Sequence, residues 1–339
     1  MMRRREFLTL PALAAQPRRL RAAFLGAAHS HAFDKLRLVK ASPDYELAGV
    51  WEESPPARKT LEKLGPLPWR PKSEILADRS IEVIFIESDV PQIPLLAIEA
   101  LEAGRHCHIE KPIAYTRERL RRIIELARQK RLIIQGGYMW RHNPAVEKAL
   151  EAARQGWLGD VYLIHARMNT LIGPDRRPEW NRFPGGQMFE QGAHLVDIVV
   201  RLLGRPQRIT SFLRHDGPFE DTLKDNTAAV LEYSRAMAII TSSVLQPNAG
   251  QHRVLEIFGS NGNAAVRPIE PPQLEIDLAK PAGPYRAGRQ KVDLPPYERY
   301  VGDIAALARA VRGERALETT AETELAVHET LLEASGMAG

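Results

Sequence analysis

The first half of this 339-residue chain alternates short apolar runs with amphipathic stretches, and this alternation limits the fold most strongly. We predict strands at 22–26, 46–51, 81–86, 105–109 and 132–135, and helices at 31–39, 55–64, 91–103 and 116–130. Strands that alternate with helices of this length are typical of βαβ units and a parallel sheet. Ligands bind such sheets beyond the C-terminal ends of the strands, so the polar residues that follow each strand are the first candidates for a site.

The composition is that of an ordinary globular protein, with 44% hydrophobic and 26% charged residues, which excludes collagen-like, coiled-coil and disordered classes. The length fits two domains. We expect no membrane insertion, because no run approaches the roughly 18–20 apolar residues that cross a bilayer. The single cysteine, Cys107, can form neither an internal disulfide nor a cysteine-based zinc site.

Residues 1–16 have the layout of an export signal. The basic cluster 3–5 precedes a short apolar run at 7–15, and Ala12 and Ala14 fit an Ala-x-Ala cleavage site. The sequence Arg-Arg-Glu-Phe-Leu resembles the twin-arginine signature, so we predict export to the periplasm, with a cytoplasmic protein as the alternative. The formal net charge of +5 lies partly in this segment, and no block of five Lys or Arg residues remains beyond it. We therefore expect no nucleic-acid partner.

The junction between the first strand and the first helix is where a dinucleotide phosphate would bind. The expected Gly-x-Gly-x-x-Gly pattern is reduced here to Gly26, with Ala28 and His31 at the other two glycine positions. Glu52 follows the second strand, where a carboxylate accepts hydrogen bonds from the adenine ribose and repels a 2′-phosphate. These features favour NAD over NADP, although Arg58 offers NADP a partner.

Two further motifs carry groups suited to chemistry. The fourth strand runs into Glu110-Lys111-Pro112, at the end of the sheet where the ligand is expected. Downstream, the segment 185–197 contains two glycines followed by a predicted helix. Its Glu190, His194 and Asp197 are spaced i, i+4 and i+7, which places all three on one helical face.

With these motifs the sequence resembles the Gfo/Idh/MocA family of NAD(P)-dependent oxidoreductases. The resemblance also includes 102–106, 141–144 and the strand and turn at 257–262. It implies an α/β Rossmann domain at 19–138, followed at 139–339 by an α+β domain with an open-faced, mainly antiparallel sheet. Strand-like runs at 161–168, 207–212, 228–232, 236–242 and 254–258 agree with that expectation. By analogy, the open sheet face makes a dimer or tetramer the expected assembly.

The resemblance implies a bound NAD or NADP. If the protein is exported, we expect this cofactor to be tightly bound. The residues expected to contact the cofactor are Gly26, Ala28, His29, Ser30, His31, Glu52, Ser88, Glu110 and Lys111. His29 and His31 could contact the pyrophosphate or nicotinamide, or cap the following helix. The sequence departs from the family pattern at three places. The glycine turn is reduced, the segment 88–93 lacks the usual His, and Glu190 occupies a position where Asp is common.

The expected chemistry is hydride transfer between nicotinamide and a carbinol carbon of a sugar, polyol or related small carbohydrate. Lys111 would hydrogen-bond the reacting oxygen, His194 would accept or relay the proton, Glu190 would orient the substrate or His194, and Asp197 would hold the imidazole. Candidates for the substrate site are Tyr138, Arg141, Asn143, Arg177, Trp180 and Asp197. Glu190 and His194 are also spaced to bind a metal ion, but we expect none. The alternatives are an NAD-dependent glycosidase of the same family and a non-catalytic carbohydrate-binding protein.

Overall fold

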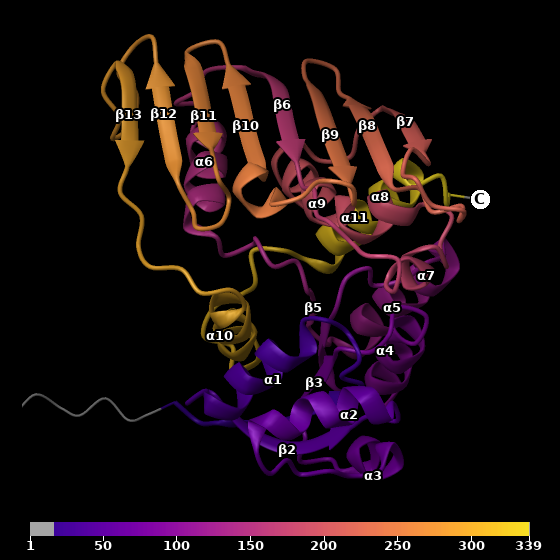
Figure 1. Ribbon diagram of the computed structural model, residues 1–339. Coiled ribbons are helices and arrows are strands. Elements are labelled where there is room, and N and C mark those ends of the chain that lie inside the picture. The colour runs from indigo at the N-terminus through magenta and orange to yellow at the C-terminus, as the bar shows by residue number, and fades with distance from the viewer. Residues whose placement is uncertain (1–16, 339) are drawn as a thin grey trace, which may run out of the picture.

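The computed structural model describes residues 17–338, so the predicted export signal lies outside the described part of the chain. The chain is built on two sheets, which Figure 1 shows one above the other with helices packed against each. None of the helices in residues 17–338 combines the length and the apolar character needed to span a bilayer. Cys107 is buried, with a free thiol.

The first domain is a five-stranded parallel sheet in the order β2-β1-β3-β4-β5. Its strands are β1 (Leu20–Leu25), β2 (Tyr45–Trp51), β3 (Val83–Ile86), β4 (His106–Ile109) and β5 (Ile134–Gly136). Its helices are α1 (Ala32–Ala41), α2 (Pro55–Leu61) with a 3₁₀ turn at Glu62–Leu64, α3 (Lys72–Ala77), α4 (Ile93–Glu102) and α5 (Arg117–Lys130). All residues of β3 are buried, which is why this strand is a continuous apolar run.

The strand order of the first domain reverses between β1 and β3. From β1 the chain crosses to β2 on one side and then returns to β3 on the other side. The loops after β1 and β3 therefore leave the sheet in opposite directions and open a crevice at its carboxyl end. The β1–α1 turn and the segment that begins at Glu87 border this crevice.

The second domain contains an eight-stranded sheet in the order β13-β12-β11-β10-β6-β9-β8-β7, antiparallel except for β6 beside β9. Its strands are β6 (Val161–Arg167), β7 (Arg208–Arg214), β8 (Asn226–Glu232), β9 (Met237–Ser243), β10 (Val254–Gly259), β11 (Gly262–Val266), β12 (Leu274–Leu278) and β13 (Gly288–Val292). The predicted strands match β6 to β10, and β11 to β13 extend the sheet. Burial alternates along β8 and β9, because helices cover one face and the other is open.

The helices of this domain fall into two groups, those that pack against the sheet and those that lie in a connecting segment. The helices that cover the sheet are α6 (Pro144–Arg154), α9 (Gly192–Leu203) and α11 (Ala321–Ala334). Two short helices, α7 (Arg177–Trp180) and α8 (Gly186–Glu190), lie in the segment between β6 and α9. A 3₁₀ turn spans Ala249–His252. The C-terminal segment then returns to the first domain. Helix α10 (Val301–Val311) packs beside α1, and Tyr45 in β2 donates a hydrogen bond to the Ile304 carbonyl at 2.9 Å. Helix α11 contacts both α5 and α9, so it holds the two domains together.

Candidate active site

A cavity of about 280 Å³ lies between the two domains at the carboxyl end of the parallel sheet. It is lined by Ala28, His29, Ser30, His31, Asp34, Asp89, Val90, Lys111, Met139, Met168, Arg176, Glu179, Trp180, Glu190, Gln191, His194, Arg253, Arg299 and Tyr300. We call it the interdomain pocket. It combines the turn after β1 and the loops after β3 and β4 with segments of the second domain, which is a common location for a ligand site.

Gly26 begins the turn after β1 in a conformation that requires glycine. Its φ is +80°, and a Cβ there would lie 2.4 Å from the Cβ of Ser88. Ser88, a predicted cofactor residue, therefore packs directly against the turn. Among residues 17–338, His29 N–H is bonded to the Glu87 carbonyl, whereas the N–H groups of Ala28 and Ser30 have no acceptor. The turn thus presents two free donors where an anionic group would bind.

Glu52 supports the other side of this turn. Its carboxylate accepts the Ala27 N–H at 2.5 Å and the Ser54 N–H at 2.7 Å. It lines a second hollow, of about 440 Å³, with Arg58 and Trp69, and the Arg58 guanidinium lies 4.5 Å from the centre of a Trp69 ring. The turn therefore separates the interdomain pocket from a hollow with an acidic group and an aromatic wall.

A buried polar cluster lies beneath the pocket. The Lys35 ammonium is 2.9 Å from Glu87 Oε1 and 2.8 Å from His108 Nε2, and it also donates to Glu110 Oε2. His108 Nδ1 in turn lies 2.8 Å from Gln135 Oε1. Burial raises the pKa of Glu110, but Lys35 and the neighbouring histidines outweigh it, so the pKa lies well below the ordinary value. Burial lowers the pKa of His108 to about 3, which keeps this imidazole neutral.

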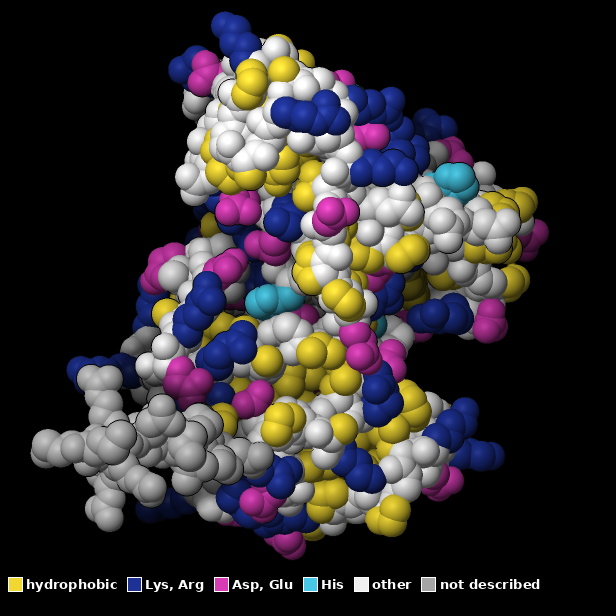
Figure 2. All heavy atoms as spheres, turned by 90° about the vertical axis from the view of Figure 1, so that its left-hand side faces the viewer, with side chains coloured by type: hydrophobic (Ala, Val, Ile, Leu, Met, Phe, Trp, Pro, Cys, Tyr) yellow, Lys and Arg dark blue, Asp and Glu magenta, His cyan; other side chains and the backbone are white. Residues whose placement is uncertain are grey.

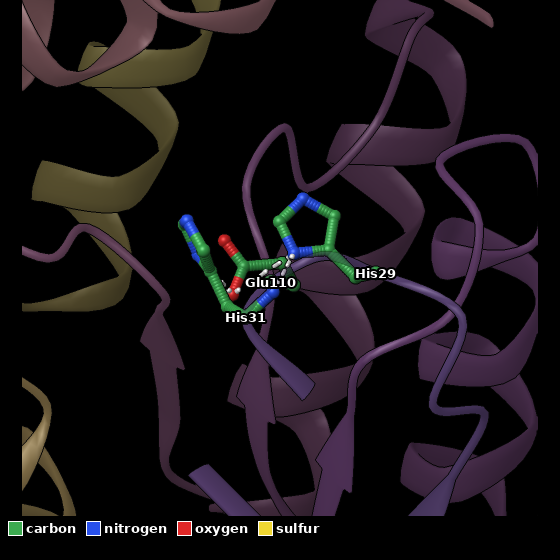
Figure 3. A group of neighbouring side chains, drawn as sticks. All are labelled: His29, His31 and Glu110. Atoms are coloured by element: carbon green, nitrogen blue, oxygen red, sulfur yellow. Dashed lines mark hydrogen bonds and ion pairs between the residues drawn. The ribbon is translucent and has the colours of Figure 1, made fainter. Parts of the chain in front are cut away.

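His29 and His31 lie on either side of Glu110, as Figure 3 shows. The Nδ1 atoms of His29 and His31 are 3.8 Å and 3.2 Å from Glu110 Oε2. Burial lowers the pKa of both imidazoles despite the attraction of Glu110. Neutral imidazoles therefore face an ionised carboxylate on the floor of the pocket. The His31 side chain does not cap α1, whereas His29 Nδ1 accepts the backbone N–H of His31, directly before this helix.

Lys111, Glu190 and His194 meet in the interdomain pocket. Lys111 Nζ donates to the Glu190 carbonyl at 3.0 Å and lies 3.7 Å from Glu190 Oε2. Burial raises the pKa of Glu190, and Lys111 opposes that shift. Burial and then Lys111 lower the pKa of His194 well below its ordinary value. Its Nδ1 has no hydrogen-bond partner within residues 17–338, so the structure brings an ammonium group and a neutral, uncommitted imidazole to one pocket.

The expectation of one helical face for Glu190, His194 and Asp197 was wrong. Helix α8 ends at Glu190 and α9 begins at Gly192, with Gln191 between them. A Cβ on Gly192 would lie 2.5 Å from the Met188 sulfur, so glycine lets the two helices meet closely. Glu190 and His194 still line the same pocket, but Asp197 accepts hydrogen bonds from Arg141 at 2.7 and 3.1 Å and makes none with His194. Asp197 therefore does not hold the imidazole.

Of the predicted substrate residues, the structure places Trp180 in the pocket. The others are held in buried contacts elsewhere. Tyr138 Oη lies 3.1 Å from His328 Nδ1, Arg141 is paired with Asp197 and Glu324, Asn143 caps α6, and Arg177 is paired with Asp221 and Asp225. Arg253, Arg299 and Tyr300 line the pocket but were not predicted, because no motif marks them. The positive φ of Tyr300, +69°, is visible only in the structure.

The surface around the domains carries both signs of charge. On the face shown in Figure 2, the described Lys and Arg side chains are interspersed with Asp and Glu side chains.

A parallel sheet with a glycine turn after β1, a carboxylate after β2 and a polar pocket at the switch in strand order defines a two-domain dinucleotide-binding protein.

Comparison with known proteins places the chain within this class. Residues 20–138 match the oxidoreductase family with an NAD-binding Rossmann fold, and residues 146–265 match the GFO/IDH/MocA C-terminal domain. The chain belongs to the GFO/IDH/MocA oxidoreductase family, and its first domain is the NAD-binding domain of that family. The resemblance seen in the sequence and the expected fold class are thereby confirmed.

The chain is also similar to several named proteins. Trans-1,2-dihydrobenzene-1,2-diol dehydrogenase of Xenopus laevis is 25% identical over 177 residues, 51% of this chain and 52% of that protein. The chain thus spans about half the length of such relatives. dTDP-3,4-didehydro-2,6-dideoxy-alpha-D-glucose 3-reductase of Streptomyces violaceoruber is 25% identical over 304 residues, 87% of this chain and 86% of that protein. The solved structure of UDP-N-acetylglucosamine 3-dehydrogenase of Acidithiobacillus ferrooxidans matches with a TM-score of 0.78 and 20% sequence identity. The match covers 95% of this chain and 98% of that chain, so the two proteins share a fold.

Proposed function

We propose that this protein transfers a hydride between NAD and a carbinol carbon of a sugar, polyol or related small carbohydrate. The observation that supports this most strongly is that Lys111, Glu190 and His194 line one pocket directly beside the turn after β1. The names of the relatives, which include a diol dehydrogenase and enzymes of nucleotide sugars, agree with a hydroxylated substrate.

The residues of the first domain fit a dinucleotide. The free N–H groups of Ala28 and Ser30 suit its pyrophosphate, and the carboxylate of Glu52 keeps lone pairs that can accept the hydroxyls of the adenine ribose. The same carboxylate would repel a 2′-phosphate, so we favour NAD over NADP. When bound, the nicotinamide supplies the acceptor or donor of the hydride.

The protein groups of the pocket can manage the proton. Lys111 is placed to donate a hydrogen bond to the reacting oxygen and to stabilise negative charge that develops there. His194 has an uncommitted Nδ1 in the same pocket as Lys111, which places it to accept the hydroxyl proton as the hydride leaves. Glu190 positions Lys111 through its carbonyl and its carboxyl group.

Two measurements test this function. Thermal unfolding of the purified protein with NAD, NADP and a panel of sugars and polyols should show a larger shift with NAD than with NADP. Absorbance of NADH should then rise with the sugars that stabilise the protein. Cleavage of a glycoside with no net change in NADH absorbance would instead identify a glycosidase. Stabilisation by sugar without any response to nucleotide would identify a binding protein and would contradict the proposal.

We propose further that the protein is exported through its arginine-led N-terminal segment with the nucleotide already bound. An exported enzyme could not readily exchange a cofactor that is made in the cytoplasm, so tight binding would be required. Mass spectrometry of the protein purified from the periplasmic fraction should detect retained nucleotide. Protein found only in the cytoplasm, or protein free of nucleotide, would contradict this part of the proposal.

A further inference from the structure

We propose that His29, His31 and Glu110 form a binding site for a divalent transition-metal ion on the floor of the interdomain pocket. The site shares the interdomain pocket with the redox function proposed above, but metal binding is a separate property that can be measured with or without a nucleotide. It also differs from the pair of Glu190 and His194 that the sequence spacing allowed.

The geometry is close to that of a metal site. One ligand atom from each of the three residues lies within 4.8 Å of the other two. Ligand atoms about 2.0–2.2 Å from a tetrahedral zinc ion lie roughly 3.3–3.6 Å from each other. The two Nδ1-to-Oε2 separations, 3.2 Å for His31 and 3.8 Å for His29, bracket that range. Figure 3 shows the imidazole rings of His29 and His31 on either side of the one carboxylate.

The protonation pattern of the two histidines suits metal binding. His29 Nδ1 accepts the backbone N–H of His31 at 3.2 Å, so this nitrogen carries a lone pair and no proton. His31 Nδ1 is buried and makes no hydrogen bond within residues 17–338, although it is 3.2 Å from the carboxylate. A buried polar atom without a partner is costly. A bound ion would replace the 3.2 Å hydrogen bond at His29 Nδ1 and would give His31 Nδ1 a partner once that nitrogen carries no proton, because imidazole binds metals through an unprotonated nitrogen.

A neighbouring group of potential ligands, Glu87, His108 and Glu110, is already neutralised by a cation. The Lys35 ammonium lies between its members, 2.9 Å from Glu87 and 2.8 Å from His108. Lys35 also donates to Glu110 Oε2, the oxygen that His29 and His31 approach, and Glu110 Oε1 accepts the Lys111 N–H. A carboxylate oxygen has two lone pairs, so Oε2 can bind one partner besides Lys35. The histidine side of Glu110 is therefore the side left for a metal.

The ligand set also indicates the kind of ion. Two imidazole nitrogens and one carboxylate oxygen suit Zn²⁺, Co²⁺, Fe²⁺ or Mn²⁺, whereas Mg²⁺ and Ca²⁺ prefer oxygen ligands. Three protein ligands leave coordination positions free, as in metal sites that bind a substrate rather than sites that only stabilise a fold. His29 and His31 line the interdomain pocket with Lys111 and His194, so the free positions would face the substrate. A hydroxyl, carbonyl or carboxylate oxygen of the substrate is the expected additional ligand.

Metal binding can be measured without any assay of activity. Untagged full-length protein, stripped with a chelator and dialysed, would be titrated with Zn²⁺ by calorimetry and with Co²⁺ by absorption spectroscopy. We expect one equivalent to bind and the d–d bands of Co²⁺ to appear. The double variant His29→Ala/His31→Ala should lose this equivalent, with a loss of affinity greater than the roughly 10- to 100-fold typical of outer-shell partners.

Matched variants keep the test decisive. His165→Ala removes a half-buried histidine of the second sheet that packs against Phe258, and it should bind the metal as the wild type does. If the double variant does not fold, metal binding is measured in the single variant His31→Asn, which keeps a polar side chain. The absence of a stoichiometric equivalent in the wild type would overturn the proposal, as would unchanged binding in a folded variant of His29 or His31. Measuring NAD binding on the same samples separates failure of the metal site from failure of the proposed function.

Discussion

Lys111 is the residue on which the proposed chemistry depends most. Its ammonium group lies in the pocket beside Glu190 and is buried, with 4% of the residue exposed. We expect Lys111→Met to lower kcat by about 10²- to 10⁴-fold, the usual contribution of a positioned acid–base group, and to leave NAD binding intact. Steady-state kinetics and a nucleotide titration would measure the two effects.

The control for this change is Lys291→Met, which removes an exposed lysine of β13. It should leave kcat unaltered. Turnover at the wild-type rate in Lys111→Met would remove Lys111 from the mechanism.

Gly26 allows a second test at the scale of one residue. In Gly26→Ala the new methyl group would meet Ser88 at 2.4 Å, in addition to the cost of a left-handed backbone at φ +80°. Gly104 has nearly the same φ, +81°, but a Cβ at this position would have no neighbour within 4 Å, so Gly104→Ala carries only the backbone cost of about 1–2 kcal/mol. Chemical unfolding should show a larger loss for Gly26→Ala, and NAD affinity should fall in that variant alone. Equal losses in both variants would show that contact with Ser88 is unimportant.

At the scale of elements, Arg141 connects three parts of the chain. It follows β5 and pairs with Asp197 in α9 and with Glu324 in α11, and all three side chains are buried. Arg141→Met would leave the buried Glu324 without its arginine and Asp197 with only Arg201, 3.9 Å away, so we expect a loss of about 3–5 kcal/mol in the free energy of unfolding. Urea denaturation would measure it.

Arg208→Met is the corresponding control, because Arg208 pairs with Glu232 on the exposed surface of the second sheet. Exposed ion pairs contribute little, so this variant should unfold as the wild type does. A similarly small effect for Arg141→Met would show that its network does not hold the helices in place.

At the scale of the molecule, His328 links stability to pH. It lies in α11 between the Ala114 carbonyl, 3.0 Å from Nε2, and the Tyr138 hydroxyl, so it joins the C-terminal helix to the first domain. Burial lowers its pKa from 6.5 to about 4. The unfolded chain therefore takes up a proton at a higher pH than the folded chain does. The stabilising effect is complete above about pH 6.5 and decreases as the pH falls toward 4, by about 3 kcal/mol in all.

His328→Gln should lack this component. The difference in free energy of unfolding between the wild type and His328→Gln should shrink as the pH is lowered from neutrality to about 4. A difference that is constant over this interval would show that His328 is not buried in its neutral form.

The elements that carry the site were largely predictable. Strands β1 to β5 lie within one or two residues of the predicted runs, because strands buried on both faces must be continuous apolar segments. Lys111 was predictable from its place after β4. The separation of α8 from α9 at Gln191 was not, because a residue spacing of i, i+4 and i+7 is unchanged by a break in the helix. Arg253, Arg299 and Tyr300 were also missed, since they reach the pocket from segments without a motif.

The sequence by itself determined the parallel sheet and the family, and it predicted the positions of Gly26 in the turn after β1 and of Lys111 and His194 at the pocket. Each of these depends on local pattern or on the end of a strand. The tertiary structure decided which charges meet. Lys35 would be read as a surface residue of α1, yet it is buried against Glu87 and Glu110. His29 and His31 acquire their relation to Glu110 only when the turn after β1 folds over the end of β4. Electrostatic contacts of this kind depend on distances between segments remote in the chain, and no sequence pattern encodes those distances.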